Sequence, residues 1–153
     1  MPRKITPISI HQYTYFGNCL DFATGHILST KTRNDSDLDY SFPIAEAFLK
    51  KLSERGYELP RQIQDESEAR EGECILKVFD FTDFEQEHPL WKGETITFKD
   101  FHVVRRELDG TWVHKPGWDD SPCEIRTDED WAAIYEEFGN KFVLFAFEPE
   151  TES

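Results

Sequence analysis

Three segments of the chain carry apolar residues at the three- and four-residue spacing of an amphipathic helix. They cover residues 18–28, 41–56 and 127–139. Each starts with a side chain that can cap a helix, and the second and third end at a glycine. The pattern therefore predicts three helices. In the first of them, Asn18 is the N-cap and Cys19 takes the first helical position.

Segments rich in Ile, Val and Phe predict the strands of a sheet. They cover residues 74–84, 95–108 and 141–147, and a short return strand covers residues 111–114. Residues 8–17 are expected to form a short strand or an extended lead-in, and the charged segments 61–73 and 85–94 are expected to be surface loops. This order predicts an α+β fold in which N-terminal helices pack on a mostly antiparallel sheet.

The size and composition of the chain suit a single domain over residues 1–153 with short flexible ends, since 38% of its 153 residues are hydrophobic. The formal net charge of -14 argues against nucleic acid and against an anionic membrane surface, because both attract clustered Lys and Arg. The same charge suits a basic protein partner. No apolar run is long enough to span a bilayer.

The three cysteines, Cys19, Cys74 and Cys123, show no CxxC spacing, which argues against a disulfide framework and a structural zinc site. Cys74 is expected in the core and Cys123 in a loop. His26 is expected to be a surface residue without a partner. The first residues hold no apolar run of signal-peptide length. We therefore expect the protein in the cytoplasm, or exported without a cleaved signal peptide.

Two histidines flank the turn in "FHVVRRELDGTWVHKPG", and the length of the turn decides whether they meet. If residues 108–110 form a three-residue loop with Gly110 in the left-handed conformation, His102 and His114 share one face of the sheet as diagonal neighbours. If only Asp109 and Gly110 form the turn, the register moves by one residue and the histidines lie on opposite faces. The sequence leaves both registers open.

The order of these residues resembles a known family of enzymes. Cys19 in "NCLDFA" starts a helix, His102 in "DFHVVRRE" opens a later strand, and His114 in "GTWVHKPG" ends the next one. This layout resembles the NlpC/P60 branch of the papain-like cysteine hydrolases. The stretch "DFHVVRRELDGTWVHKPG" also resembles a motif of poorly described bacterial and phage proteins that carry an Asn-Cys near the front. The resemblance implies a papain-like domain.

The chain departs from the NlpC/P60 pattern at three points. It reads Asn-Cys-Leu-Asp at the predicted nucleophile, where the family usually reads Asp-Cys-Ser-Gly. Tyr13 and Tyr15 precede Cys19 but lie in no matching motif. The chain also shows no signal sequence, although the family often acts on cell-wall peptides. The substrate is therefore the part of the resemblance that transfers least.

The resemblance implies a cysteine peptidase or amidase that acts through an acyl-thiol intermediate, with no cofactor and no metal. Cys19 would be the nucleophile, with a thiol pKa lowered by the helix N-terminus. His102 would be the base, and His114 would orient it. The Cys19 N–H would bind the oxyanion, and Asn18, Tyr13 and Tyr15 are weaker candidates for this role or for binding substrate. The substrate would be a peptide, a protein or peptidoglycan, and the protein an effector or toxin.

Three other hypotheses remain open from the sequence. The same three residues suit a deamidase or an acyltransferase. A non-catalytic interaction or immunity-type protein would use the acidic surface to bind a basic partner. A metal site made by Cys19, His102 and His114 would suit zinc, although no fourth ligand is evident by pattern.

Overall fold

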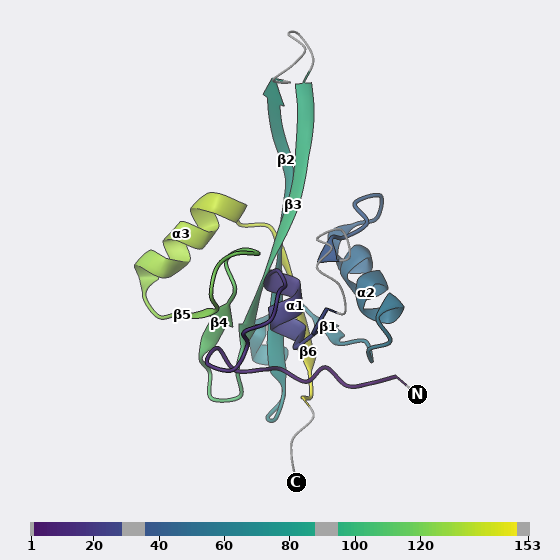
Figure 1. Ribbon diagram of the computed structural model, residues 1–153, viewed down its shortest axis with the longest axis vertical. Coiled ribbons are helices and arrows are strands. Elements are labelled where there is room, and N and C mark those ends of the chain that lie inside the picture. Colours follow the sequence, from purple (N-terminus) through teal and green to yellow (C-terminus); the bar gives the residue numbers. More distant parts are fainter. Residues whose placement is uncertain (1, 29–35, 88–94, 150–153) are drawn as a thin grey trace.

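The computed structural model describes residues 2–28, 36–87 and 95–149, and one antiparallel sheet organises this part of the chain. Its six strands follow the spatial order β1-β6-β2-β3-β4-β5. The strands are β1 (Arg61–Ile63), β2 (Cys74–Glu87), β3 (Thr95–Arg106), β4 (Trp112–His114), β5 (Cys123–Ile125) and β6 (Phe142–Phe147). The far ends of β2 and β3 extend beyond the body of the protein as a two-stranded ribbon (Figure 1).

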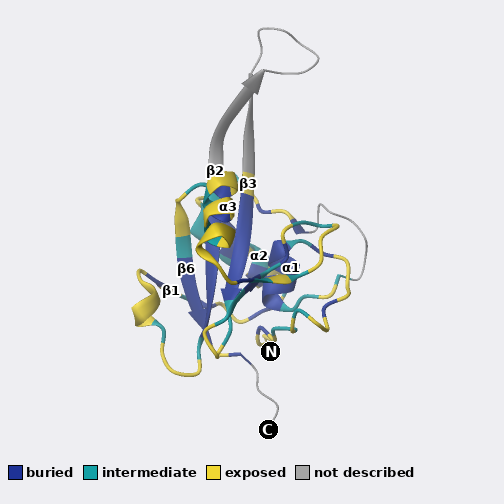
Figure 2. Cartoon of the chain, turned by 90° about the vertical axis from the view of Figure 1, so that its left-hand side faces the viewer, coloured by how far each residue is buried: buried dark blue, intermediate teal, exposed yellow. Residues whose placement is uncertain are grey.

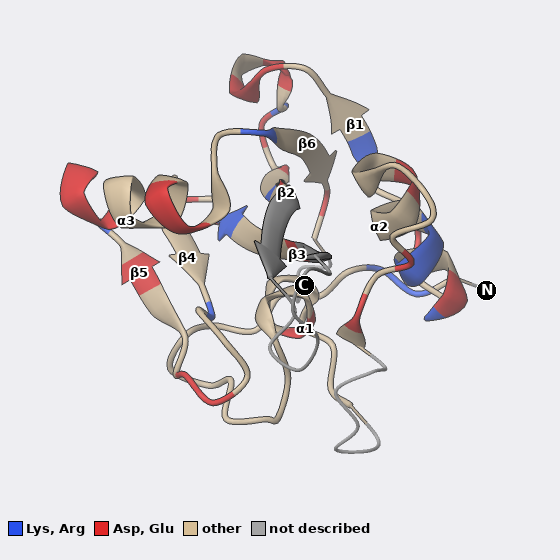
Figure 3. Cartoon of the chain, turned by 90° about the horizontal axis from the view of Figure 1, so that it is seen from above, with Lys and Arg blue, Asp and Glu red and all other residues tan. Residues whose placement is uncertain are grey.

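Helices cover both faces of the sheet. α1 (Cys19–Thr24) and α2 (Ile44–Glu54) pack on one face and α3 (Asp128–Phe138) packs on the other, with a short 3-10 helix (Glu66–Glu68) beside β1 (Figures 1 and 3). The central strands are buried between these layers (Figure 2). None of the helices in the described part of the chain is both long and apolar enough to cross a membrane. The fold is therefore α+β with an antiparallel sheet, as the sequence predicts.

The side chains of β3 alternate between the two helical layers, as they do in any strand. Phe101 and Val103 belong to the hydrophobic cluster under α1 and α2. His102 stacks on Phe138 of α3, and Val104 belongs to the cluster under that helix. In this part of β3, odd-numbered residues therefore face α1 and α2, and even-numbered residues face α3.

Arg105 ties α1 and the N-terminal segment to β3. Its side chain is fully buried, and its guanidinium donates hydrogen bonds to the carbonyl oxygens of Phe22 (3.0 Å), Ala23 (3.2 Å) and Ile8 (3.0 Å). It also pairs with the Glu107 carboxylate at 2.6 Å. The last carbonyl groups of a helix lack partners within the helix, so this buried cation satisfies the C-terminal end of α1.

Asp21 holds the other side of α1. Its carboxylate is fully buried and accepts hydrogen bonds from the Asn18 backbone N–H (2.9 Å) and the Ser36 hydroxyl (2.6 Å). It also pairs with Arg55 at 2.8 Å, next to the C-terminus of α2. The Asn18 side chain in turn caps the helix by accepting from the N–H groups of Leu20 and Asp21. A six-residue helix is marginal alone, so these polar contacts help fix α1 in place.

The structure corrects several boundaries. The first helix ends at Thr24, because Gly25 adopts the left-handed conformation with φ +68°, and α2 is preceded by Pro43 rather than capped by Ser41. Two segments expected to be loops contain the short edge strands β1 and β5, so Cys123 lies in a strand. The predicted loop 85–94 begins as strand, and residues 88–94 lie outside the described part.

His26 is also placed differently from the prediction of an unpartnered surface residue. Its Nδ1 lies 2.8 Å from the hydroxyl oxygen of Tyr57, so it joins α1 to the chain that follows α2. Burial lowers the pKa of His26 to about 4. Its partner is far away in sequence, which is why no local pattern revealed it. Cys74, by contrast, is buried as predicted.

We predict that Arg105→Lys destabilises the fold by about 3 kcal/mol, because an ammonium cannot replace the planar fork that serves several buried carbonyl oxygens. The measurement is the free energy of unfolding in urea. Arg106→Lys is the matched control, since Arg106 is the next residue but lies half-buried on the other face of β3. Equal stability of the two variants would contradict the anchoring role of Arg105.

Candidate functional site

The hairpin between β3 and β4 brings the two predicted histidines together. The backbone N–H of Glu107 donates to the carbonyl oxygen of Thr111 at 2.7 Å, which closes a three-residue loop with Gly110 at φ +91°. His102 Nε2 then lies 2.8 Å from His114 Nδ1. The hairpin therefore has the three-residue register, one of the two that the sequence left open, and the side chains meet as the diagonal neighbours expected in this register.

The histidine pair is built into the layer between the sheet and α3. His102 is 1% exposed, and its ring stacks on Phe138 with the centroids 4.4 Å apart and the planes 3° from parallel. The His114 ring stands nearly perpendicular to it, at 84°. His102 is thus held by stacking on Phe138 and by its hydrogen bond to Nδ1 of the more accessible His114.

Burial keeps both imidazoles neutral. It lowers the pKa of His102 to about 3, with a further contribution from the neighbouring His114, and it lowers the pKa of His114 to about 4. The charge of Asp130 opposes the second shift. A hydrogen bond between two neutral rings needs one N–H and one bare nitrogen. When His114 Nδ1 is the donor, His114 Nε2 is bare and can accept a proton.

Cys19 does not join this pair. It is 6% exposed and lies in the cluster that contains Phe101 and Val103, on the α1 face of β3, whereas His102 faces α3. Burial raises the pKa of the Cys19 thiol to about 12, the opposite of what an activated nucleophile needs. The predicted nucleophile Cys19 and the predicted base His102 are therefore not brought together, because Arg105 holds α1 on the face of β3 that His102 does not share.

The three weaker candidates also lie away from the histidines. Tyr13 is 2% exposed and donates its hydroxyl to the carbonyl oxygen of His26 at 2.9 Å, and burial raises its pKa. The Asn18 amide donates to the carbonyl oxygen of Ser36 at 2.8 Å in addition to capping α1. Tyr15 is 43% exposed and lies edge-on to Tyr13. Tyr13 and Asn18 are therefore used to hold the N-terminal segment.

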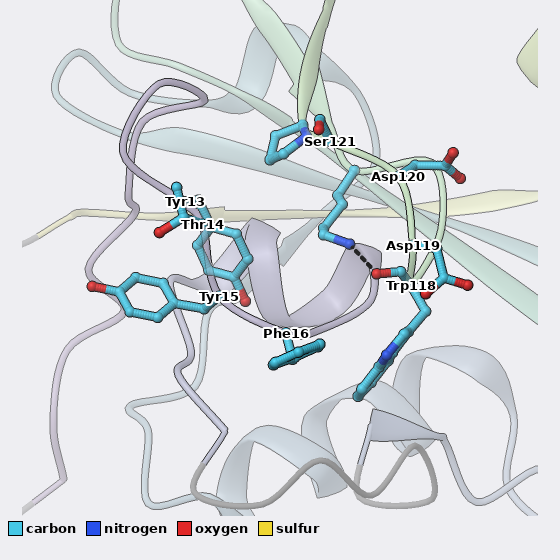
Figure 4. Close-up of a pocket in the computed structure, with 10 residues that line it drawn as sticks. Tyr13, Thr14, Tyr15, Phe16, Trp118, Asp119, Asp120 and Ser121 are labelled. Carbon is cyan, nitrogen blue, oxygen red and sulfur yellow. Dashed lines mark hydrogen bonds between the residues drawn. The ribbon is translucent and has the colours of Figure 1, made fainter.

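Tyr13 and Tyr15 line a different cavity, of about 240 Å³, between residues 13–16 and 115–122. Figure 4 shows Tyr15 and Phe16 across this cavity from the loop that carries Trp118. The Lys115 ammonium donates to the carbonyl oxygen of Trp118 at 2.6 Å, which fixes that loop. This cavity shares no lining residue with the one that His102 and His114 line.

A thiol that the sequence did not single out faces His114. β4 and β5 pair with His114 directly opposite Cys123. Such partners lie on the same face of a sheet with their Cβ atoms about 5 Å apart. Both residues line a cavity of about 210 Å³ between β4, β5 and α3. Its lining includes His102, His114, Cys123, Asp130, Glu137 and Phe138.

Cys123 and His114 are both uncharged at rest. Burial raises the pKa of the Cys123 thiol, and the charges of Asp130 and Asp120 raise it further. The pair is therefore a neutral thiol beside a neutral imidazole, not a thiolate–imidazolium pair. The sequence signal for this placement is the alternation in Cys-Glu-Ile at residues 123–125, which is too short to predict a strand.

The described residues also bear on the metal hypothesis. Cys19 lies on the opposite face of β3 from His102 and His114, so these three side chains do not converge. Across the described ranges, no group of three or more His, Cys, Asp and Glu side chains is arranged to hold a metal ion. The predicted zinc set of Cys19, His102 and His114 therefore has no support in the geometry.

We predict that lowering the pH from 7 to 5 destabilises the protein through His102. In the unfolded chain His102 binds a proton below its ordinary pKa of about 6.5, whereas in the folded protein it binds one only near pH 3. The free energy of unfolding therefore falls by about 2 kcal/mol at pH 5. His102→Leu should remove this part of the pH dependence, whereas the part due to His26, whose pKa burial also lowers, should remain. The measurement is the free energy of unfolding at both pH values, and His11→Leu, at an exposed histidine, is the control. An unchanged pH dependence in His102→Leu would contradict the neutral buried ring.

A comparison of the chain with models of protein families, with curated proteins and with solved structures finds no match. The resemblance to the NlpC/P60 branch therefore stays a hypothesis that rests on the order and spacing of residues in this chain. A proposal for the function therefore rests on the geometry and chemistry of the site.

Proposed function

We propose that the protein is a cysteine hydrolase of amide or peptide bonds in which Cys123 is the nucleophile, His114 the general base and His102 a positioning residue. One observation carries the proposal. His114 lies between a buried imidazole that holds one of its nitrogens and a thiol that faces it across β4 and β5, at an open cavity. A nucleophile, a base and a third group that orients the base are the parts that covalent catalysis requires.

The neutral resting state favours general-base catalysis of thiol attack. His114 Nε2 takes the proton of the Cys123 thiol as sulfur bonds to the carbonyl carbon of the substrate. The carbon–nitrogen bond then breaks, and the His114 imidazolium gives its proton to the leaving amine. Water attacks the remaining thioester with His114 again as the base, which releases the acid and restores the thiol.

His102 contributes by fixing the tautomer of His114. In the tautomer that the proposal requires, His102 Nε2 accepts the N–H of His114 Nδ1, which leaves His114 Nε2 bare. The stacking of His102 on Phe138 prevents its ring from turning. A hydrogen-bond acceptor without a charge supports the imidazolium less than a carboxylate does, so the role of His102 is mainly orientation.

The proposal keeps part of the NlpC/P60 hypothesis and changes part of it. It keeps the hairpin with two histidines, the acyl-thiol intermediate and a peptide, protein or peptidoglycan substrate. It replaces Cys19 by Cys123 and places His114, not His102, next to the thiol. The papain-like fold stays a proposal as well. Deamidation and acyl transfer use the same intermediate, and the leaving group or acceptor decides among the three reactions.

A non-catalytic interaction protein is the second candidate, and the acidic surface of α3 favours it. Figure 3 shows acidic residues at both ends of α3 and on β5. On α3 they are Asp128, Glu129, Asp130, Glu136 and Glu137. A surface of this kind would steer a basic partner protein toward the helix. The non-catalytic candidate is favoured if His114 does not increase the reactivity of the Cys123 thiol.

We expect 4-nitrophenyl acetate to acetylate Cys123 at least tenfold faster than it acetylates the same thiol in His114→Gln, because general-base catalysis contributes that much or more. The measurements are nitrophenolate release and peptide mass spectrometry to locate the acetyl group. Cys123→Ser should abolish the reaction, whereas Cys19→Ala, at the buried thiol, should leave its rate unchanged. The opposite pattern would return the nucleophile to Cys19.

The pH profile of acetylation gives a separate prediction. Protonation of His114 removes the base, so the rate should fall to half its plateau near pH 4, where the pKa of His114 lies, and not near 6.5. In His114→Gln only the thiolate reacts, and its rate should rise about tenfold per pH unit through neutral pH. Identical profiles for the two proteins would contradict the role of His114.

A further inference from the structure

One stripe of α3 faces the cavity that holds His114 and Cys123. Asp130, Ile134 and Glu137 are three or four residues apart, so they share a face of the helix, and all three line the cavity. Ile134 is 5% exposed and packs in the core cluster under α3, which fixes this face against the sheet. Two carboxylates of α3 are thus held at the wall of the proposed active site.

The two carboxylates make the cavity negative. Glu124 of β5 also lines it, but its carboxylate pairs with Arg126, so the charge comes from Asp130 and Glu137, and none of the described residues that line the cavity is Lys or Arg. Hydrogen bonds from the backbone N–H groups of Arg126 and Thr127 lower the pKa of Asp130, so it stays ionised. The charge of Asp130 acts on both proposed catalytic groups, because it raises the pKa of Cys123 and of His114.

These carboxylates oppose the charge that develops during thiol attack. The carbonyl oxygen of the substrate becomes an oxyanion next to a wall that is already negative, and an anionic substrate would meet the same repulsion. A positive charge on the substrate removes both penalties. The volume of about 210 Å³ is below the 300–1,000 Å³ typical of sites that enclose a whole ligand, so it suits one side chain.

The geometry points to a basic substrate, in which a lysine or arginine side chain of a polypeptide enters this cavity beside Asp130 and Glu137 while its own carbonyl group is attacked by Cys123. This inference rests on the proposed function. It names the substrate class of the same site: basic peptide or protein segments, not neutral or acidic ones.

The test uses three activated esters whose side chains have similar length and end in a positive, a neutral or a negative group. They are the 4-nitrophenyl esters of Nα-acetyl-lysine, Nα-acetyl-norleucine and Nα-acetyl-2-aminoadipate. We expect the second-order rate of Cys123 acylation to be at least tenfold higher for the lysine ester than for the norleucine ester, and lowest for the aminoadipate ester. Added salt should reduce the preference, because it screens exposed charges.

Glu137→Gln and Glu136→Gln form a matched pair of variants, because the two residues are neighbours on α3 and only Glu137 lines the cavity. We expect Glu137→Gln to reduce the lysine-over-norleucine preference about threefold and Glu136→Gln to leave it unchanged. Equal rates for the lysine and norleucine esters would overturn the basic-substrate inference while the proposed function stood. If none of the esters acylates Cys123, the proposed function fails and the inference fails with it.

Discussion

The buried guanidinium of Arg105 is the interaction on which the arrangement of the two faces depends. It sits on β3 and serves the carbonyl oxygens of Phe22 and Ala23 at the end of α1, together with that of Ile8. A buried cation without these partners would be very costly, so α1 must lie on the face that Arg105 occupies. Alternation along the strand then sends His102, three residues earlier, to the other face.

This division separates two cysteines that differ in their local sequence and in their surroundings. Cys19 begins a helix, the position that lowers a thiol pKa in many enzymes, but its side chain is buried among apolar residues and desolvation dominates. Cys123 has no helix dipole, yet it shares a cavity with His114 because β5 pairs with β4. The position at a helix start favours Cys19 as a nucleophile, whereas the tertiary contacts favour Cys123.

The electrostatics of the site fit a neutral resting state and a charged reaction path. Burial holds both imidazoles unprotonated, and burial together with nearby carboxylates holds the thiol protonated. In the proposed mechanism, charge appears only when His114 takes the thiol proton, and Asp130 would then lie near the new imidazolium. The acidic surroundings that disfavour a thiolate would thus stabilise the protonated base, and the proposed basic substrate would compensate the charge of the oxyanion.

The sequence by itself determined the features that depend on neighbouring residues. Asn18 and Thr127 cap helices as predicted, Gly110 closes the three-residue loop that was one of two open registers, and the central strands follow their apolar runs. It could not decide which face of β3 would receive α1, because that depends on whether Arg105 or His102 finds partners far away in the chain. Nor could it reveal β5, whose three residues form a strand only when β4 lies beside them. The candidate site lies where these long-range contacts meet, so only the tertiary structure decided which thiol faces His114.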